Sequence, residues 1–212
     1  MGDFGGHVIH ALAGLAIMMG LVYHRVMKTR PSVTLIAGAT GTGKSTYALQ
    51  QAMACDGVII NADSMQVYRE LRILSARPTP ADEARALHVL YGHIGGSESY
   101  SVAQWAREAA QCLSNAQANG QPAFVVGGTG LYFRVLLEGL SPIPEIPPTV
   151  RNRWRQAGLS QSAEDLHQQL ASIDHLAADH LAPTDTQRIV RALEVMEATG
   201  RSIISWRSIA PT

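Results

Sequence analysis

Short apolar runs recur along the middle of the chain and end in glycines or polar residues. They are SVTLIA (32–37), DGVIINADS (56–64) and PAFVVGGTG (122–130). Runs of this length, rich in β-branched residues and without polar alternation, are typical of strands that are buried on both faces. The pattern therefore predicts three strands of one parallel sheet.

Amphipathic stretches separate these runs. A helix is expected from about Lys44 to Ala54, and a second one over 101–120. In the second, Ser101 is the expected N-cap, Gly120 the expected stop, and an apolar stripe recurs at helical spacing, formed by Val102, Trp105, Ala109 and Leu113. Alternation of strands and helices favours right-handed crossovers in a parallel α/β sheet flanked by helices.

The pattern changes after Gly139. The stretch SPIPEIPPTVRNRWRQ (141–156) carries four prolines and is interpreted as a linker, because proline breaks regular structure. Two helical stretches follow, at about 160–171 and 185–199, and the second starts near Thr184 or Asp185 and stops at Gly200. We expect a small helical appendage here.

The front of the chain does not fit this alternation. Residues 4–24 contain no Lys, Arg, Asp or Glu, and a basic cluster at 25–30 follows them. The run is long enough to span a bilayer, so membrane contact through residues 4–24 is one interpretation. The favoured one is a non-native start or dispensable extension, with Met27 as an alternative first residue.

Composition narrows the class of protein. The 212 residues are 46% hydrophobic and 16% charged, which agrees with a globular chain, and the formal net charge of zero excludes a global basic field for nucleic acid. Cys55 and Cys112 belong to no C-x-x-C pair. They predict a reduced, cytoplasmic protein.

The sequence GATGTGKS matches the phosphate-binding pattern G-x-x-x-x-G-K-[ST] without a mismatch, after a predicted strand and before a predicted helix. Its glycines let backbone N–H groups surround phosphate oxygens, its lysine adds a point charge, and its serine hydroxyl can bind Mg²⁺. We therefore expect a P-loop NTPase-like fold with a diphosphate or nucleotide site made of Gly38, Ala39, Thr40, Gly41, Thr42, Gly43, Lys44 and Ser45.

Two further groups follow predicted strands. Asp63 would lie beside this loop, where a carboxylate can act as a base or hold a metal ion, and a helix cap is its alternative role. Thr129, after two glycines, could donate to a phosphate or cap a tight turn. Tyr100 and Trp105 suit core packing better than stacking on bases.

Four blocks, in this order and spacing, resemble the tRNA dimethylallyltransferases. They are GATGTGKS, INADSMQVYRELRILSARPT, FVVGGTGLYFRVLLEGLSPIP and PTDTQRIVRALEVMEATGRS, and the similarity covers about 32–204. Members of this family move a dimethylallyl group from its diphosphate to N6 of the adenosine 3′ of the anticodon. The resemblance thus implies dimethylallyl diphosphate, a tRNA anticodon stem-loop and Mg²⁺ as ligands of a protein that we expect to be a monomer.

The resemblance also implies roles for individual residues. Asp63 corresponds to the general base and Thr129 to a residue that contacts the diphosphate, so both are expected to be catalytic. The metal would contact Ser45. The implied tRNA-binding residues are Asp63, Ser64, Met65, Gln66, Arg151, Thr184, Asp185, Thr186, Gln187 and Arg188.

The chain departs from the family pattern in two places. The family has Gly-Thr-Ala-Lys-Pro where this chain has Leu74–Pro78, in which Ser75 keeps a hydroxyl and Arg77 a charge. The family also continues for about another third of its length, with a Gly-Tyr-Arg-Gln block, so we expect a truncated form whose activity is in question.

The expected organisation has three parts: an extension (1–31), a P-loop core (32–140) and a proline-rich, helical tRNA-contacting segment (141–212). Two other functions stay open. A P-loop kinase of small molecules or nucleosides would have the same beginning, with Arg151, Arg153 and Arg155 as its lid. An inactive tRNA-binding fragment is the other.

Overall fold

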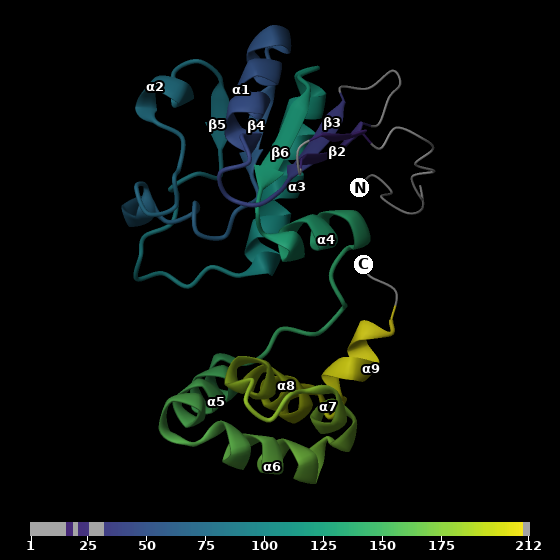
Figure 1. The fold of residues 1–212 in the computed structure, drawn as a ribbon. Helices are drawn as coiled ribbons and strands as arrows, with labels where there is room; N and C mark the ends of the chain where they lie inside the picture. The colour runs from purple at the N-terminus through teal and green to yellow at the C-terminus, as the bar shows by residue number, and fades with distance from the viewer. Residues whose placement is uncertain (1–15, 19–20, 26–31, 210–212) are drawn as a thin grey trace. The chain divides into compact units, whose positions relative to one another are not determined.

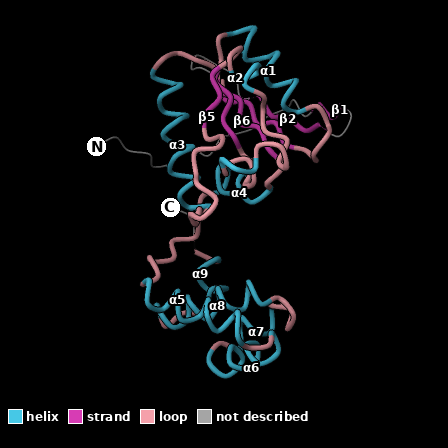
Figure 2. Tube along the Cα trace, turned by 90° about the vertical axis from the view of Figure 1, so that its left-hand side faces the viewer, coloured by secondary structure: helices cyan, strands magenta, loops and turns pink. Residues whose placement is uncertain are grey.

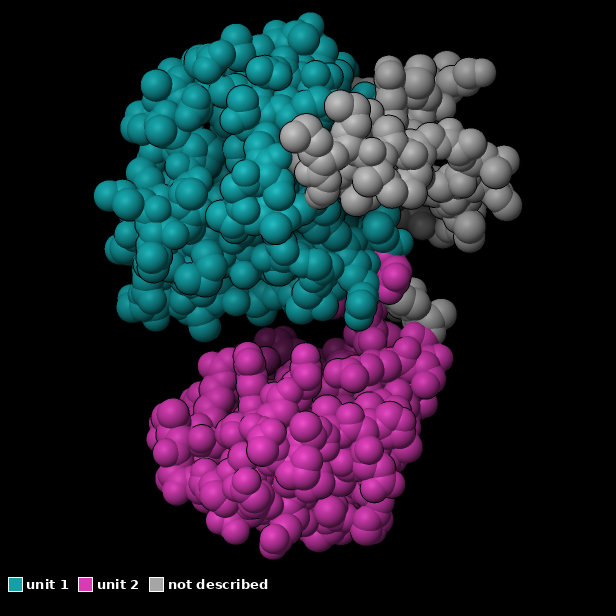
Figure 3. Space-filling view, in the orientation of Figure 1, with its two compact units in different colours: residues 1–137 teal, residues 138–212 magenta. Residues whose placement is uncertain are grey.

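The computed structural model describes residues 16–18, 21–25 and 32–209. The chain divides into two compact units, Met1–Leu137 and Glu138–Thr212 (Figure 3). The first unit holds the sheet and the second is helical. No helix within the described ranges is long and apolar enough to cross a membrane.

The sheet of the first unit has the strand order β1-β2-β3-β6-β4-β5 (Figure 1). Strands β3, β6, β4 and β5 run parallel, whereas β1 and β2 add an antiparallel pair beside β3. The expected parallel α/β sheet is confirmed. The bounds are β1 (Ala16–Met18), β2 (Leu21–Arg25), β3 (Val33–Ala37), β4 (Val58–Asn61), β5 (Leu87–Val89) and β6 (Ala123–Gly127).

The sequence predicted β3, β4 and β6 but not the other three strands. β5 is short and begins with an exposed leucine, so it carries no buried-strand pattern. β1 lies within the stretch 4–24 and β2 runs one residue past it, to Arg25; the rest of this stretch lies outside the described residues.

Alternate residues of the central strands pack on opposite faces of the sheet. Ile36, Ile59, Phe124 and Val126 form one core with helix α1 (Lys44–Cys55). Their neighbours in the strands pack on the other face with helices α3 (Val102–Ala118) and α4 (Gly130–Glu138). The helices therefore cover both faces of the sheet (Figure 2), which explains the continuous apolar runs.

Helix α3 begins where the sequence placed its start. The Ser101 hydroxyl accepts a hydrogen bond from Gln104 N, and the Gln104 side chain accepts one from Ser101 N, which completes a capping box. Gly120, with a φ of 69°, follows the helix end. Two short elements precede this helix, the 3₁₀ helix η1 (Arg69–Leu71) and helix α2 (Pro80–Glu83).

In the described part of the second unit, to residue 209, five helices pack around one core. They are α5 (Pro148–Ser160), α6 (Ala163–Ile173), α7 (His175–His180), α8 (Thr186–Thr199) and α9 (Ile203–Arg207). The interpretation of 141–156 as a linker was wrong from Pro148 onward, because proline is tolerated in the first turn of a helix, where its missing N–H costs nothing. Ile146, 1% exposed, also ties the preceding segment to the core of this unit.

Candidate phosphate and adenosine site

The loop Gly38–Ser45 connects β3 to the first turn of α1. Gly41 and Gly43 have φ values of 83° and 84°, a left-handed conformation that glycine adopts without steric cost. Gly43 is the N-cap of α1 and has no side chain with which to cap it. The first N–H groups of the helix are therefore left to an outside acceptor, as in phosphate-binding loops.

Lys44 lies across this loop. Its Nζ donates a hydrogen bond of 2.7 Å to the carbonyl oxygen of Ala39, which also accepts one of 2.9 Å from the Thr42 hydroxyl. Burial lowers the pKa of Lys44, and the nearby carboxylate of Asp63 partly offsets this by raising it. The ammonium and the carboxylate therefore act on one another electrostatically.

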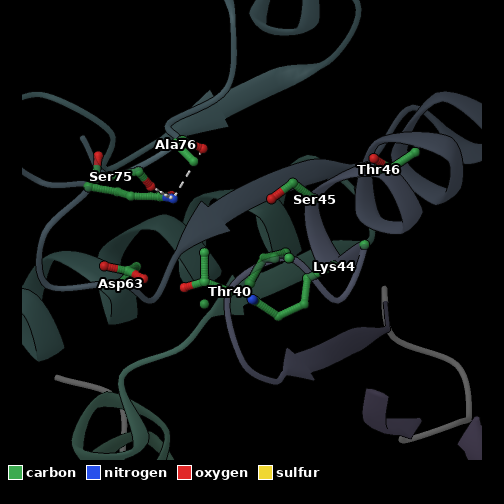
Figure 4. Close-up of a pocket in the computed structure, with 12 residues that line it drawn as sticks. Thr40, Lys44, Ser45, Thr46, Asp63, Ser75 and Ala76 are labelled. Atoms are coloured by element: carbon green, nitrogen blue, oxygen red, sulfur yellow. Dashed lines mark hydrogen bonds between the residues drawn. The ribbon is translucent and has the colours of Figure 1, made fainter. Parts of the chain in front are cut away.

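Asp63 follows β4 and turns toward the loop (Figure 4). Its Oδ1 accepts a hydrogen bond of 2.9 Å from Met65 N, which fixes a local turn. Its Oδ2 is directed elsewhere: a Cβ built on Gly128 would lie 3.5 Å from this oxygen and 3.5 Å from Gly38 O. One carboxylate oxygen thus stabilises the turn, and the other lies near the start of the phosphate loop.

The end of β6 and the residues that follow it approach the Asp63 turn closely. A Cβ at Gly127 would lie 2.0 Å from the carbonyl oxygen of Ala62, so a larger residue does not fit. Thr129 N donates to the same oxygen at 3.2 Å, and the Thr129 hydroxyl accepts a hydrogen bond of 2.9 Å from Ser64 N. Thr129 therefore braces the turn, and its expected contact with a diphosphate stays a prediction.

A cavity of about 280 Å³ joins these parts (Figure 4). Of the residues that line it, Lys44 is the one cation and Asp63 the one anion. Seven predicted site residues meet here, namely Thr40, Gly41, Gly43, Lys44, Ser45, Asp63 and Gln66. The remaining wall consists of Thr46, Ser75, Ala76, Val126 and Gly127.

The wall at Ser75 is where the chain departs from the family pattern. The Gln66 amide donates to Ser75 O at 2.8 Å, and the Ser75 hydroxyl donates to Leu71 O at 2.6 Å, so that hydroxyl is already engaged. Arg77 is 8% exposed, packs over Gly92, and has Glu83 as its nearest acid at 3.9 Å. Burial lowers the pKa of Arg77. The Arg77 side chain is therefore nearly buried, and it is not among the residues that line the cavity.

A metal ion would find few protein ligands in this site. No group of three or more His, Cys, Asp or Glu side chains suited to a metal occurs in the described part of the chain. The cavity does bring together the Ser45 hydroxyl and the Asp63 carboxylate. Mg²⁺ usually keeps several waters and is held by one or two carboxylates together with substrate phosphates, so this sparse set fits it.

The other predicted site residues belong to the helical unit. Arg151 lies in the first turn of α5 and is partly exposed. Residues 184–188 surround the start of α8 at Thr186, where the side chain of the N-cap Asp185 accepts a hydrogen bond from Arg188 N. The Arg188 side chain is 71% exposed and pairs with Asp185 at 2.8 Å. Both arginines therefore offer charge on the surface of this unit.

Sequence reasoning missed Asn61, the last residue of β4. It is 0% exposed, and its backbone carbonyl accepts a hydrogen bond of 2.7 Å from the Trp105 indole N–H. Trp105 is also fully buried and stacks on Tyr132 with ring centroids 4.2 Å apart, which confirms its expected place in the core. The sequence offered one signal for Asn61: it is a polar residue at the end of a strand that is otherwise apolar and buried.

Comparisons with known proteins identify relatives of this chain. The family model described as IPP transferase matches residues 66–211, and the one described as isopentenyl transferase matches residues 31–93. A tRNA dimethylallyltransferase of Azorhizobium caulinodans is 53% identical over 189 residues, which are 89% of this chain and 60% of that relative. One from a Chelativorans species is 52% identical and covers 84% of this chain and 61% of the relative.

Two solved structures are similar as well. A eukaryotic dimethylallyltransferase that acts on tRNA has a TM-score of 0.71 at 25% identity and covers 87% of this chain and 46% of its own. The full-length tRNA isopentenylpyrophosphate transferase of Bacillus halodurans has a TM-score of 0.51 at 32% identity. The match covers 81% of this chain and 56% of that structure's chain. The chain spans about 60% of the length of the curated relatives that it matches.

Proposed function

The chain belongs to the IPP transferase family, and on that premise we propose that it transfers a dimethylallyl group from dimethylallyl diphosphate to N6 of the adenosine 3′ of the anticodon in tRNA. One observation carries the proposal. A single cavity holds a phosphate-binding loop and, opposite it, a carboxylate that can take a proton. Prenyl transfer to an amine needs both, because a diphosphate leaves while a proton is lost.

The phosphate loop would hold the leaving group. Free N–H groups at the start of α1 point to where phosphate oxygens would bind, and Lys44 adds a full positive charge. As the bond between the allylic carbon and oxygen breaks, the diphosphate takes the electron pair and its charge grows. Donors already aimed at that charge stabilise the transition state.

Asp63 would act on the acceptor. The exocyclic amine of adenine is a weak nucleophile, and N6 gains positive character as its bond to the allylic carbon forms. A carboxylate within hydrogen-bond reach can accept the N6 proton. The Oδ2 atom of Asp63 is the candidate, because Oδ1 is bound to Met65 N.

Mg²⁺ is the proposed cofactor, held by the Ser45 hydroxyl with Asp63 nearby. When bound, it would neutralise charge on the diphosphate. The thiols of Cys55 and Cys112 are free, which supports action in the reducing cytoplasm.

The proposed tRNA contacts lie in both units. Residues 63–66 would meet the adenosine, which must be turned out of its stack to reach a pocket. Arg151 and residues 184–188 would meet the backbone, where arginine gives position rather than sequence. In this proposal residues 32–140 bind the donor and residues 141–212 contact tRNA, while the stretch 1–31 adds β1 and β2 to the sheet of the donor-binding part.

The test incubates the 212-residue chain with labelled dimethylallyl diphosphate, Mg²⁺ and an unmodified anticodon stem-loop. Labelled RNA and free diphosphate are expected, and Lys44→Ala should abolish both because the leaving group loses its charge partner. RNA that binds but gains no label would favour a tRNA-binding fragment. Transfer of the ATP γ-phosphate to a small acceptor, with no label in RNA, would favour a kinase.

A further inference from the structure

The side-chain amide of Asn61 forms hydrogen bonds with both backbone groups of Asp63, its N–H and its C=O. Asn61 Oδ1 accepts a hydrogen bond of 2.9 Å from Asp63 N, and Asn61 Nδ2 donates one of 2.9 Å to Asp63 O. A second N–H of the same amide reaches Leu90 O at 3.0 Å. Both donors and the acceptor of this fully buried amide are therefore engaged.

Asn61 is itself held from two directions. Its backbone carbonyl accepts the indole hydrogen bond of buried Trp105. On the other side, Leu90 has a φ of 64°, which is unfavourable for a branched residue, and its carbonyl meets the Asn61 amide. An unfavourable backbone conformation persists only where contacts with the surrounding structure hold it in place, and such residues are often found at functional sites.

We propose that Asn61 is a positioning residue for the transfer reaction, which holds the Asp63 carboxylate at its place beside the phosphate loop. The inference rests on the proposed function, since it assumes that Asp63 is the base. The competing interpretation is that the amide merely satisfies buried carbonyls, with no consequence for Asp63.

The phosphate loop and the Asp63 turn, which form two sides of the cavity, are held by different contacts. The phosphate loop is fixed by β3, α1 and the hydrogen bonds to Ala39 O, none of which involves Asn61. The Asp63 turn depends on the Asn61 amide at both its N–H and its C=O. Removal of the amide should therefore displace the carboxylate and leave donor binding intact. A displacement of about 1 Å at a reacting group costs on the order of 10²-fold in rate.

A double-mutant cycle tests this dependence. Asn61→Ala should lower kcat by roughly 10²-fold with little change in KM for dimethylallyl diphosphate. In an Asp63→Asn background the same substitution should cost almost nothing more, because its effect passes through a base that is already gone. Asn61→Ser, whose hydroxyl can still make one of these bonds, should lose less, and Asn115→Ala on the exposed face of α3 is the matched control.

A second measurement is independent of turnover. Amide hydrogen exchange by NMR should become faster at Asp63 N in Asn61→Ala, while the amides of β3 and β6 keep their protection. Thermal unfolding checks that each variant is folded, and Asn61→Ser replaces Asn61→Ala if the latter is not.

The outcomes distinguish this inference from the proposed function. Full additivity of the two substitutions, or unchanged exchange at Asp63, overturns the positioning role of Asn61. A parent chain that transfers no label overturns the proposed function, and the exchange experiment then still decides whether Asn61 holds the Asp63 turn. Coupled loss of rate with faster exchange supports both.

Discussion

Replacement of Asp63 by asparagine should remove the base without disturbing the site. Oδ1 accepts from Met65 N, and an asparagine oxygen can accept the same hydrogen bond, so the turn should persist. Only the second oxygen, which would lie 3.5 Å from a Cβ built on Gly128, becomes a group that cannot take a proton. Loss of a general base costs about 10²–10⁴-fold, or about 2.7–5.4 kcal/mol of transition-state stabilisation.

The assay is single-turnover transfer of labelled dimethylallyl to an anticodon stem-loop, with binding of pyrophosphate measured by calorimetry without Mg²⁺ on the same samples. Binding should be kept in Asp63→Asn, because the phosphate loop is untouched, while transfer falls. Asp179→Asn, an exposed carboxylate on α7, is the matched control. Near-normal transfer in Asp63→Asn would show that Asp63 is not the base and that its role is to stabilise the local turn.

The same variant has an electrostatic signature that does not depend on turnover. In the folded chain burial lowers the pKa of Lys44 and the Asp63 charge raises it. Asp63→Asn removes the raising effect, so the pKa of Lys44 should fall further below 10.5. NMR titration of the Lys44 ammonium measures this shift, and a pKa that stays at the parent's value would show that the two groups are not coupled.

Three further results are expected. Gly127→Ala should prevent correct folding, because its Cβ would lie 2.0 Å from a backbone oxygen, whereas Gly130→Ala, with open space, should be tolerated; circular dichroism and thermal melts compare them. Trp105→Phe should lower the free energy of unfolding in urea by about 1–3 kcal/mol, since the Asn61 carbonyl loses its buried donor, and an unchanged midpoint would contradict this. Arg188→Ala should reduce the salt slope of tRNA binding by about one unit, and an unchanged slope would show that it meets no phosphate.

Much of the first unit could be predicted from local pattern. The strands β3, β4 and β6 are buried on both faces, so their apolar runs are visible without any knowledge of neighbours. The α3 capping box and the phosphate loop are likewise local, because each depends on residues a few positions apart. Elements with weak local signals were not predicted. β5 is only three residues long, and the prolines before and at Pro148 were interpreted as a linker although α5 begins there.

The sequence by itself determined the phosphate loop, since glycine conformations and the lysine and serine at fixed offsets need no tertiary partner. Only the tertiary structure decided how Asp63 is held. Its turn depends on hydrogen bonds between residues 29, 44 and 65 positions apart, from Asn61 to Leu90, from Trp105 to Asn61 and from Ser64 to Thr129. Such pairs leave no periodicity along the chain, because the strand order that brings them together is set by packing of the whole sheet.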